Sequence, residues 1–520
     1  MKRVALIDLG SNSVRFVISE ITESGSYRLI YQQKESIRLS EGMWTHQMLT
    51  KSAMERAIKT LKALSHMAKA MGVTEIQGIA TAAVRLASNG NSFIRRVYAE
   101  TGIPLRPISG EEEAYLGFLG VVNTIGLDDF IVFDLGGASI EISLIENRQL
   151  KKSVSLPMGA LVMTGQFQSN HEFTKAEYTS MISHIQDVLH RETWLRNVKL
   201  PLIGIGGTAR NIAKMDQREK NYPIPKLHNY KVKKATMEAL FQRVKETPWE
   251  ERKKISGLSS ERADIIVAGM AIIMELMEYT KASSMIVSGC GLREGLFFQY
   301  YGSHYSGEMY GLPCLQKNGV VDDIVTHSTL NVLRSFTPHD VDHSLYIAKL
   351  SKLIYKQWKE LMPEGERLKL LLKVASLLHD LGKQINYYSH ARHSAYMIIN
   401  SNLYGLSHRE QLLSAFIASY SHGANSKFIK QSPYLSLLKE GDRELIQKLS
   451  FPLALAEALE ETHERTVRSI QSYITDKQID MRVEVQELSH IPMMEMAIEK
   501  LKKQCKKEFK RELVIHWNVR

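Results

Sequence analysis

The feature that most constrains this chain is a phrase that occurs twice, Asp-Leu-Gly at the end of an apolar, strand-like run. The first copy is ALIDLGSNSVR at residues 5–15, and the second is IVFDLGGASIE at residues 131–141. In both copies a second strand-like run follows the glycine turn, so each copy predicts a strand–turn–strand hairpin. The two matching hairpins indicate a duplicated domain, with a cleft between its halves that both turns line.

The rest of the chain divides by its pattern. The first 300 residues alternate strand-like and helix-like segments, which is typical of an α/β protein. The alternation breaks at the turn-rich stretch YYGSHYSGEMYGLPC, and helical patterns follow. We therefore expect two α/β domains at 1–125 and 126–305, an all-helical domain at 320–475, and a small strand–helix–strand unit at 476–520.

Composition excludes several classes of protein. Of the 520 residues, 44% are hydrophobic and 24% charged, as in ordinary globular proteins. No apolar run approaches the roughly 20 residues of a membrane span, and the first residues do not resemble a signal peptide. Cys290, Cys314 and Cys505 are widely spaced without a CxxC pair, which favours reduced thiols in a cytoplasmic protein. The net charge of +11 favours a polyanionic partner.

Three glycine turns are candidates for phosphate binding. Backbone N–H groups in such turns can bind an anion, and glycine lets the backbone approach it closely. The third turn, GIGGTAR at 204–210, also begins a predicted helix, which is a common anion site. The candidate contacts are Asn12 and Ser13 in the first turn, Gly136, Gly137 and Ser139 in the second, and Gly206, Gly207 and Thr208 in the third. Three such turns favour one shared phosphate cleft over three unrelated turns.

Carboxylates accompany these turns. Asp8, Asp134 and Glu141 stand at strand ends, where their oxygens suit Mg²⁺ bridging to substrate phosphates. The alternative for Glu141 is an exposed position on an alternating strand. In ISGEEEAYL, three glutamates at 111–113 open a predicted helix, and taken alone they complement its dipole. A glutamate that pointed into the phosphate cleft would instead be a general base for water.

Six motifs, in this order, resemble those of the exopolyphosphatase/guanosine-pentaphosphate phosphatase family. They are DLGSNSVR, ATAAVRLASN, ISGEEEAYL, DLGGASIE, GIGGTARNIA and VSGCGLREG. That family belongs to the actin/sugar-kinase/heat-shock ATPase superfamily. The resemblance implies duplicated ribonuclease-H-like (actin-like) domains with an interdomain cleft, phosphoanhydride hydrolysis with Mg²⁺, and a homodimer.

The resemblance also implies roles for single residues. Arg85, a planar and permanently charged fork, would contact phosphate; its alternative is a surface salt bridge. Asp134 and Glu141 correspond to the family's metal-binding and water-positioning carboxylates. The base would be one of the glutamates at 111–113, with Glu113 the first choice and Glu112 the second.

This chain departs from the family pattern at two places. The family usually has Gly-Gly-Gly-Ser-Thr-Glu where this chain has Gly-Gly-Ala-Ser-Ile-Glu at 136–141, so a threonine hydroxyl is missing. Val162 stands where relatives usually have arginine. Both changes concern substrate preference rather than the core machinery.

The helical region resembles an HD-type domain, whose histidine and aspartate side chains can hold divalent metals. The resemblance rests on the order of His343, the pair His379-Asp380, and then His393 and His422; at the position of the final aspartate, Glu460 is the nearest carboxylate. The alternative for His390, His393 and His408 is a polar position at a helix end. We expect this HD-like domain to bind substrate rather than form a second active site. Whether it binds metal stays open. The basic run at 501–511 is either a solvated helix face or an extension of a basic channel.

The sequence therefore predicts an exopolyphosphatase that removes terminal phosphates from inorganic polyphosphate, using Mg²⁺ and a glutamate-activated water. The first alternative is guanosine pentaphosphate (pppGpp) 5′-phosphohydrolase activity. An ATP-driven conformational module and a non-enzymatic polyphosphate or alarmone sensor are alternatives of other classes. A long polyphosphate substrate would need a basic tunnel, whereas a guanine nucleotide would need a pocket for its base. The length of this protein favours the tunnel. We expect no membrane partner and no specific nucleic acid.

Overall fold

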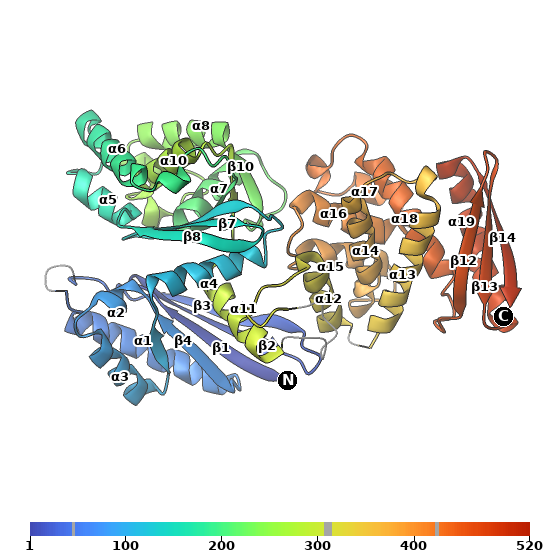
Figure 1. The fold of residues 1–520 in the computed structure, drawn as a ribbon, viewed down its shortest axis with the longest axis horizontal. Coiled ribbons are helices and arrows are strands. Elements are labelled where there is room, and N and C mark those ends of the chain that lie inside the picture. Colours follow the sequence, from blue (N-terminus) through green and yellow to red (C-terminus); the bar gives the residue numbers. More distant parts are fainter. Residues whose placement is uncertain (44–46, 306–314, 338, 422–425, 520) are drawn as a thin grey trace. The chain divides into compact units, whose positions relative to one another are not determined.

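The structure is a computed structural model that describes residues 1–43, 47–305, 315–337, 339–421 and 426–519. It divides into two compact units, Met1–Ile324 and Val325–Arg520 (Figure 1). Cys314 and His422 lie outside the described residues. No helix in the described ranges is long and apolar enough to cross a membrane.

The first sheet has the strand order β3-β2-β1-β4-β5. Its strands are β1 (Lys2–Leu9), β2 (Ser13–Ile21), β3 (Tyr27–Ser36), β4 (Glu75–Ala80) and β5 (Leu105–Pro107). The three helices that follow within this half are α1 (Lys51–Ala70), α2 (Ala82–Leu86) and α3 (Gly90–Thr101). The side chain of Thr50 caps α1 by accepting from the Ala53 N–H, and Ala57, Leu61 and Leu64 form its buried face, as their spacing predicts.

The second sheet repeats this arrangement. Its order is β10-β11-β9-β6-β7-β8, so β6, β7, β8, β9 and β11 correspond to β1 through β5. The strands are β6 (Phe130–Leu135), β7 (Ile140–Glu146), β8 (Gln149–Leu156), β9 (Leu202–Gly206), β10 (Tyr230–Lys233) and β11 (Ser284–Val287). The accompanying helices are α5 (Ala160–Phe167), α6 (Lys175–His190), α7 (Gly207–Glu219), α8 (Lys234–Glu246), α9 (Trp249–Arg252) and α10 (Ile266–Thr280). The predicted duplication is confirmed.

The two Asp-Leu-Gly turns match in detail. The N–H of Gly10 donates to the carbonyl of Ser13 at 3.1 Å, and that of Gly136 donates to Ser139 at 3.0 Å. In the strand register Asp8 lies opposite Arg15 on the neighbouring strand. The corresponding positions of the second hairpin hold the two candidate metal ligands of that hairpin, one opposite the other. The same turn therefore presents an acid–base pair in one half and two acids in the other.

Two helices lie between the sheets, α4 (Gly110–Val122) and α11 (Leu292–Tyr305) (Figure 1). Although α4 follows the first sheet in sequence, it packs on β6, β7 and β8, whereas α11 packs on β1. The helices touch backbone to backbone: a β-carbon on Gly120 would lie 2.1 Å from the Gly291 carbonyl oxygen, and one on Gly295 only 1.8 Å from that of Leu116. Only glycine allows this approach.

The second unit is a helical bundle with a small sheet attached. The helices are α12 (Ile324–Phe336), α13 (Val341–Gln357), α14 (Glu366–Leu378), α15 (His390–Asn400), α16 (His408–Ser421), α17 (Ser426–Lys430) and α18 (Asp442–Ala458). The sheet has the order β12-β13-β14, with β12 (Val467–Ile474), β13 (Gln478–Val485) and β14 (Glu512–Val519), and α19 (Ile491–Phe509) between the last two strands. Trp358 stacks on Phe451, and Phe509 of α19 meets both rings edge-on, which joins the bundle to the C-terminal unit.

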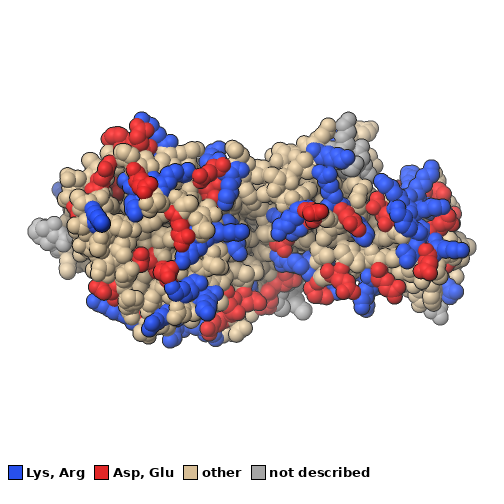
Figure 2. All heavy atoms as spheres, turned by 90° about the horizontal axis from the view of Figure 1, so that it is seen from above, with Lys and Arg blue, Asp and Glu red and all other residues tan. Residues whose placement is uncertain are grey.

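The predicted strand–helix–strand at the C-terminus is confirmed, but the helical interpretation of residues 467–474 is wrong. These residues form β12, which pairs antiparallel with β13. In the basic run, Lys502 and Lys506 are exposed and pair with Glu499 and Glu512. Figure 2 shows acidic and basic side chains interspersed along the visible face, in keeping with an excess of charge that is spread over the chain.

Candidate active site

A small cavity brings three predicted residues together. Glu113 from the first turn of α4, Asp134 from β6 and Glu141 from β7 line a hollow of about 30 Å³, which Leu292 of α11 also borders. The glycine turn fixes the end of β6, and the N-cap Ser109 fixes the start of α4 by accepting from the Glu112 N–H at 3.0 Å. The cavity therefore joins the start of α4 to the second hairpin.

Glu113 has the properties of a general base. Burial, and then the nearby charge of Glu141, raise the pKa of Glu113 to about 7. Arg85 opposes this rise: its guanidinium lies 3.1 Å from a Glu113 oxygen and also donates to the carbonyl of Ile108 at 2.8 Å. A carboxylate with a pKa near neutral pH can accept a proton from water and release it again.

The neighbouring glutamates of α4 are placed differently. Glu112 forms a two-pronged ion pair with Arg106, with one bond of 2.9 Å, and Glu111 is exposed. Neither borders the cavity. The geometry thus favours Glu113 over Glu112 as the base.

Asp8 is a buried carboxylate and Asp134 a partly buried one. Burial raises the pKa of both, and the charge of Asp134 contributes to the rise at Asp8. Arg15 lies 3.3 Å from Asp8 and opposes the rise. Burial also raises the pKa of Glu141, whose oxygen accepts from the hydroxyls of Ser139 and, at 2.9 Å, Ser155.

The chemistry of these oxygens suits Mg²⁺, although among the described residues they do not converge as the ligands of a closed metal site do. A cation would offset the charge that burial makes costly, and Mg²⁺ commonly takes only one or two carboxylates, completed by water and substrate phosphate. The residues that would hold it are Asp8, Asp134 and Glu141.

The third glycine turn is shaped by its neighbours. Gly206 has a φ of +98°, and a β-carbon there would lie 3.0 Å from an Asp134 oxygen. At Gly207 a β-carbon would lie 2.0 Å from the guanidinium carbon of Arg262. Thr208 is buried, and its hydroxyl lies against Gly269 of α10, so only its backbone is suited to a phosphate contact.

The remaining predicted phosphate contacts lie on the first two turns. Asn12 is exposed and Ser13 is buried. Within the described residues, no hydrogen bond takes the N–H groups of Gly137 and Ala138. The hydroxyl of Ser139 donates to Glu141, so this side chain orients the carboxylate.

Sequence reasoning missed a group of five cations, which we call the basic group: Arg15, Lys34, Arg210, Arg262 and Arg293. Burial, and then the charge of Arg15, lower the pKa of both Arg210 and Arg262. Partial desolvation and three of the arginines lower the pKa of Lys34, and the charge of Arg293 acts on both Asp8 and Arg210. Cations that crowd one another in this way are suited to bind an anion with several charges.

The sequence does contain a signal for three cations of the basic group. Arg15, Arg210 and Arg293 each follow a glycine turn within a few residues, in DLGSNSVR, GIGGTAR and CGLREG. Arg262 has no such signal, since only the fold brings it against Gly207.

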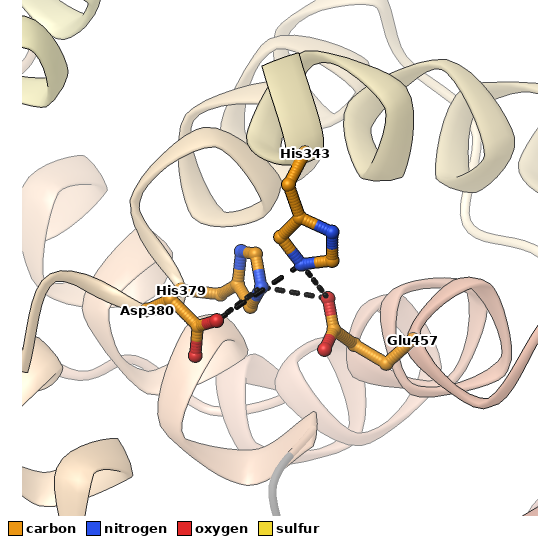
Figure 3. Close-up of side chains that lie close together, drawn as sticks. All are labelled: His343, His379, Asp380 and Glu457. Carbon is orange, nitrogen blue, oxygen red and sulfur yellow. Dashed lines mark ion pairs between the residues drawn. The ribbon is translucent and has the colours of Figure 1, made fainter. Parts of the chain in front are cut away.

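In the helical unit four side chains converge: His343 of α13, His379 and Asp380 after α14, and Glu457 of α18 (Figure 3). We call them the histidine–carboxylate cluster. The expectation that Glu460 is the inward carboxylate is wrong. Glu460 lies beyond the end of α18, where it accepts from the Arg465 N–H at 3.0 Å. His393 and His408 are not members of the cluster.

The duplicated sheets, with α4 packed on the second sheet and α11 on the first, define a protein of the actin-like superfamily. The sequence model of the Ppx/GppA phosphatase family matches residues 17–304, and that of Ppx/GppA phosphatase domain III matches residues 325–501. The chain belongs to the Ppx/GppA phosphatase family and is a phosphatase of the polyphosphate or guanosine-pentaphosphate type.

Solved structures of proteins described as Ppx/GppA phosphatases or exopolyphosphatases are similar to this chain. The Aquifex aeolicus Ppx/GppA family member is 29% identical with a TM-score of 0.51, over 57% of this chain and 96% of that one. The type II variant of the Aquifex aeolicus Ppx/GppA phosphatase is 28% identical with a TM-score of 0.50, over 57% and 98% of the two chains. An exopolyphosphatase from Cytophaga hutchinsonii is 25% identical with a TM-score of 0.54, over 58% and 98%.

Proposed function

We propose that the protein is an exopolyphosphatase that hydrolyses the terminal phosphate of inorganic polyphosphate. The observation that carries this proposal is Glu113, a partly buried carboxylate whose pKa is raised to about 7, beside Asp134 and Glu141 in one cavity. The charges of four arginines of the basic group act on Asp8 or Asp134, and such a group suits a chain of phosphates.

In the proposed mechanism Glu113 takes a proton from a water molecule as the water oxygen attacks the terminal phosphorus. The bond between that phosphorus and the bridging oxygen breaks, and the shortened chain leaves with this oxygen. General-base catalysis of this kind contributes roughly 10²- to 10⁴-fold to the rate. Arg85 holds the Glu113 carboxylate in place. Mg²⁺, when bound, would neutralise charge on the transferring phosphoryl group.

The remaining site residues would bind and orient substrate. The N–H groups of Gly137 and Ala138 and the guanidinium groups of Arg210 and Arg262 would bind the equatorial oxygens and the leaving chain. Because the two N–H groups belong to the backbone of a turn, they would need little reorganisation as charge develops.

Guanosine pentaphosphate is the second candidate, because the same acids and the same cations can act on a 5′-triphosphate. The homodimer and the cytoplasmic location stay predictions.

The test is release of phosphate from three substrates by the full-length protein: polyphosphate of defined length, guanosine pentaphosphate and ATP. We expect kcat/KM to be highest for polyphosphate. A higher value for guanosine pentaphosphate would select the second candidate, and activity on none of the three in the presence of Mg²⁺ would refute both. Glu113→Gln is the matched inactive variant and Glu112→Gln its control.

A further inference from the structure

The histidine–carboxylate cluster lies in the helical unit and takes no part in the proposed reaction. Its four ligand atoms all lie within 4.8 Å of one another, and no second group of this kind occurs among the residues that the structure describes. Figure 3 shows the two imidazole rings and the two carboxylates pointing toward one centre. They come from three helical segments far apart in sequence, so only the fold assembles them.

The distances suit a metal ion. His343 Nε2 lies 4.0 Å from Asp380 Oδ2 and 3.8 Å from Glu457 Oε1, and His379 Nε2 lies 3.4 Å from the same Asp380 oxygen. Ligands at about 2.1 Å from a tetrahedral metal are separated by about 3.4 Å. Only the distance between His379 Nε2 and Glu457 Oε1, 2.6 Å, is shorter than this separation. It would have to lengthen by less than about 1 Å for a cation to replace the direct contact of these two atoms.

Ion pairing within the protein leaves part of this geometry unexplained. His379 and Glu457 can form a buried pair, and Lys383 contacts Asp380. His343 is different: both its ring nitrogens are buried, and within the described residues neither has a hydrogen-bond partner. Burying an imidazole without a partner is costly. A metal ion at the centre would satisfy Nε2.

The surroundings orient the ligands. His379 Nδ1 lies 2.7 Å from the carbonyl oxygen of Ser376, so Nδ1 carries the proton and Nε2 faces the centre. The ring of His463 stacks on that of His343 with centroids 4.2 Å apart and planes at 20°. Such outer partners are typical of metal-binding histidines.

We propose that the histidine–carboxylate cluster binds one divalent transition-metal ion. Two imidazoles and two carboxylates suit Mn²⁺, Fe²⁺, Co²⁺, Ni²⁺ or Zn²⁺ better than Mg²⁺, which prefers oxygen ligands alone. The ion's two positive charges balance the two carboxylates. The side chains of Asp380 and Glu457 are 11% and 20% exposed, so a small ion can reach the site.

The test uses Mn²⁺ and the metal-depleted full-length protein. Pulsed electron paramagnetic resonance detects imidazole nitrogen bound to Mn²⁺, and the residues lining the cavity at Glu113 include no histidine. Besides any Mn²⁺ held by the acids at Asp134, we expect one Mn²⁺ per chain that is coupled to two imidazole nitrogens, and this coupling should be retained in Asp134→Asn. His343→Ala should lose one nitrogen coupling. Glu457→Gln should weaken this site at least tenfold, the lower end of the roughly 10- to 100-fold cost of losing even an orienting partner.

Matched controls are His339→Ala, an exposed histidine just before α13, and Glu444→Gln, an exposed glutamate of α18. Both should bind Mn²⁺ as the wild type does. Wild-type protein saturated with Mn²⁺ but without imidazole coupling would overturn the proposal, whether or not the variants fold. Coupling that is unchanged in His343→Ala would overturn it as well.

Discussion

The Glu113→Gln substitution tests the site through both catalysis and stability. The amide keeps the shape of the side chain and cannot act as a base, so we expect kcat to fall roughly 10²- to 10⁴-fold with little change in KM. Glu112→Gln should leave kcat almost unchanged, because Glu112 pairs with Arg106 away from the cavity. Phosphate release over a range of polyphosphate concentrations measures both constants.

The stability effect has a definite sign. The pKa of Glu113 rises from 4.5 to about 7 on folding, so folded protein binds the proton more tightly than unfolded protein does. Ionisation of Glu113 therefore lowers the free energy of unfolding as the pH rises through the window between these two values. The side chain is 23% exposed. The linkage relation gives a loss of about 2.5 kcal/mol between pH 5 and pH 8.5 in the wild type, which the glutamine variant avoids.

This difference is measurable as a melting temperature. For a unit of 324 residues, at about 2.1 cal/mol/K of unfolding entropy per residue, 2.5 kcal/mol corresponds to about 4 °C. Between pH 5 and pH 8.5, Glu113→Gln should therefore gain about 4 °C relative to wild type, whereas Glu112→Gln should not. The reasoning is refuted if Glu113→Gln shows no such pH-dependent gain, or if it keeps full activity.

Three further predictions concern other parts of the site. Glu141→Gln should raise the Mg²⁺ concentration for half-maximal activity, whereas Glu146→Gln, exposed at the end of the same strand, should not; Mg²⁺ titrations compare them. Gly207→Ala displaces the flexible guanidinium of Arg262 without unfolding the chain, so KM for polyphosphate should rise roughly tenfold or more at unchanged melting temperature; an unchanged KM contradicts the role of Arg262. A chain ending at Ile324 should keep activity on short polyphosphate and lose the preference for long chains, most clearly at low salt; equal activity on long chains would exclude a contribution from the second unit.

Most of the fold could be predicted because the duplication is written into the sequence. β12 could not be, and the reason lies in its irregular pairing. A register shift between Val467 and Ser469 brings Val467 and Ile470 to the buried face. A spacing of three imitates a helix, so the pattern read as a continuation of α18.

A site residue could be predicted where it belongs to a sequence motif. It could not be predicted where only the fold brings it to the site. The start of α4 follows from ISGEEEAYL, and burial then distinguishes Glu113 from Glu112. The inward carboxylate of α18 depends on where that helix ends. The helix stops at Ala458, so the carboxylate that faces the histidines is Glu457 rather than Glu460. Arg262 was not predictable, since its partner is the bare backbone of a glycine.

The backbone contact between α4 and α11 has a consequence for how the enzyme works. Since no side chain separates Gly120 from Gly291, or Gly295 from Leu116, these helices can turn against each other only as a rigid pivot. The first turn of α4 carries Glu113, and its shaft packs on the second sheet while α11 packs on the first. The direction in which the Glu113 carboxylate points therefore depends on the angle between the two halves. In the proposed mechanism, a substrate bound by both halves would set that angle before water attacks the phosphorus.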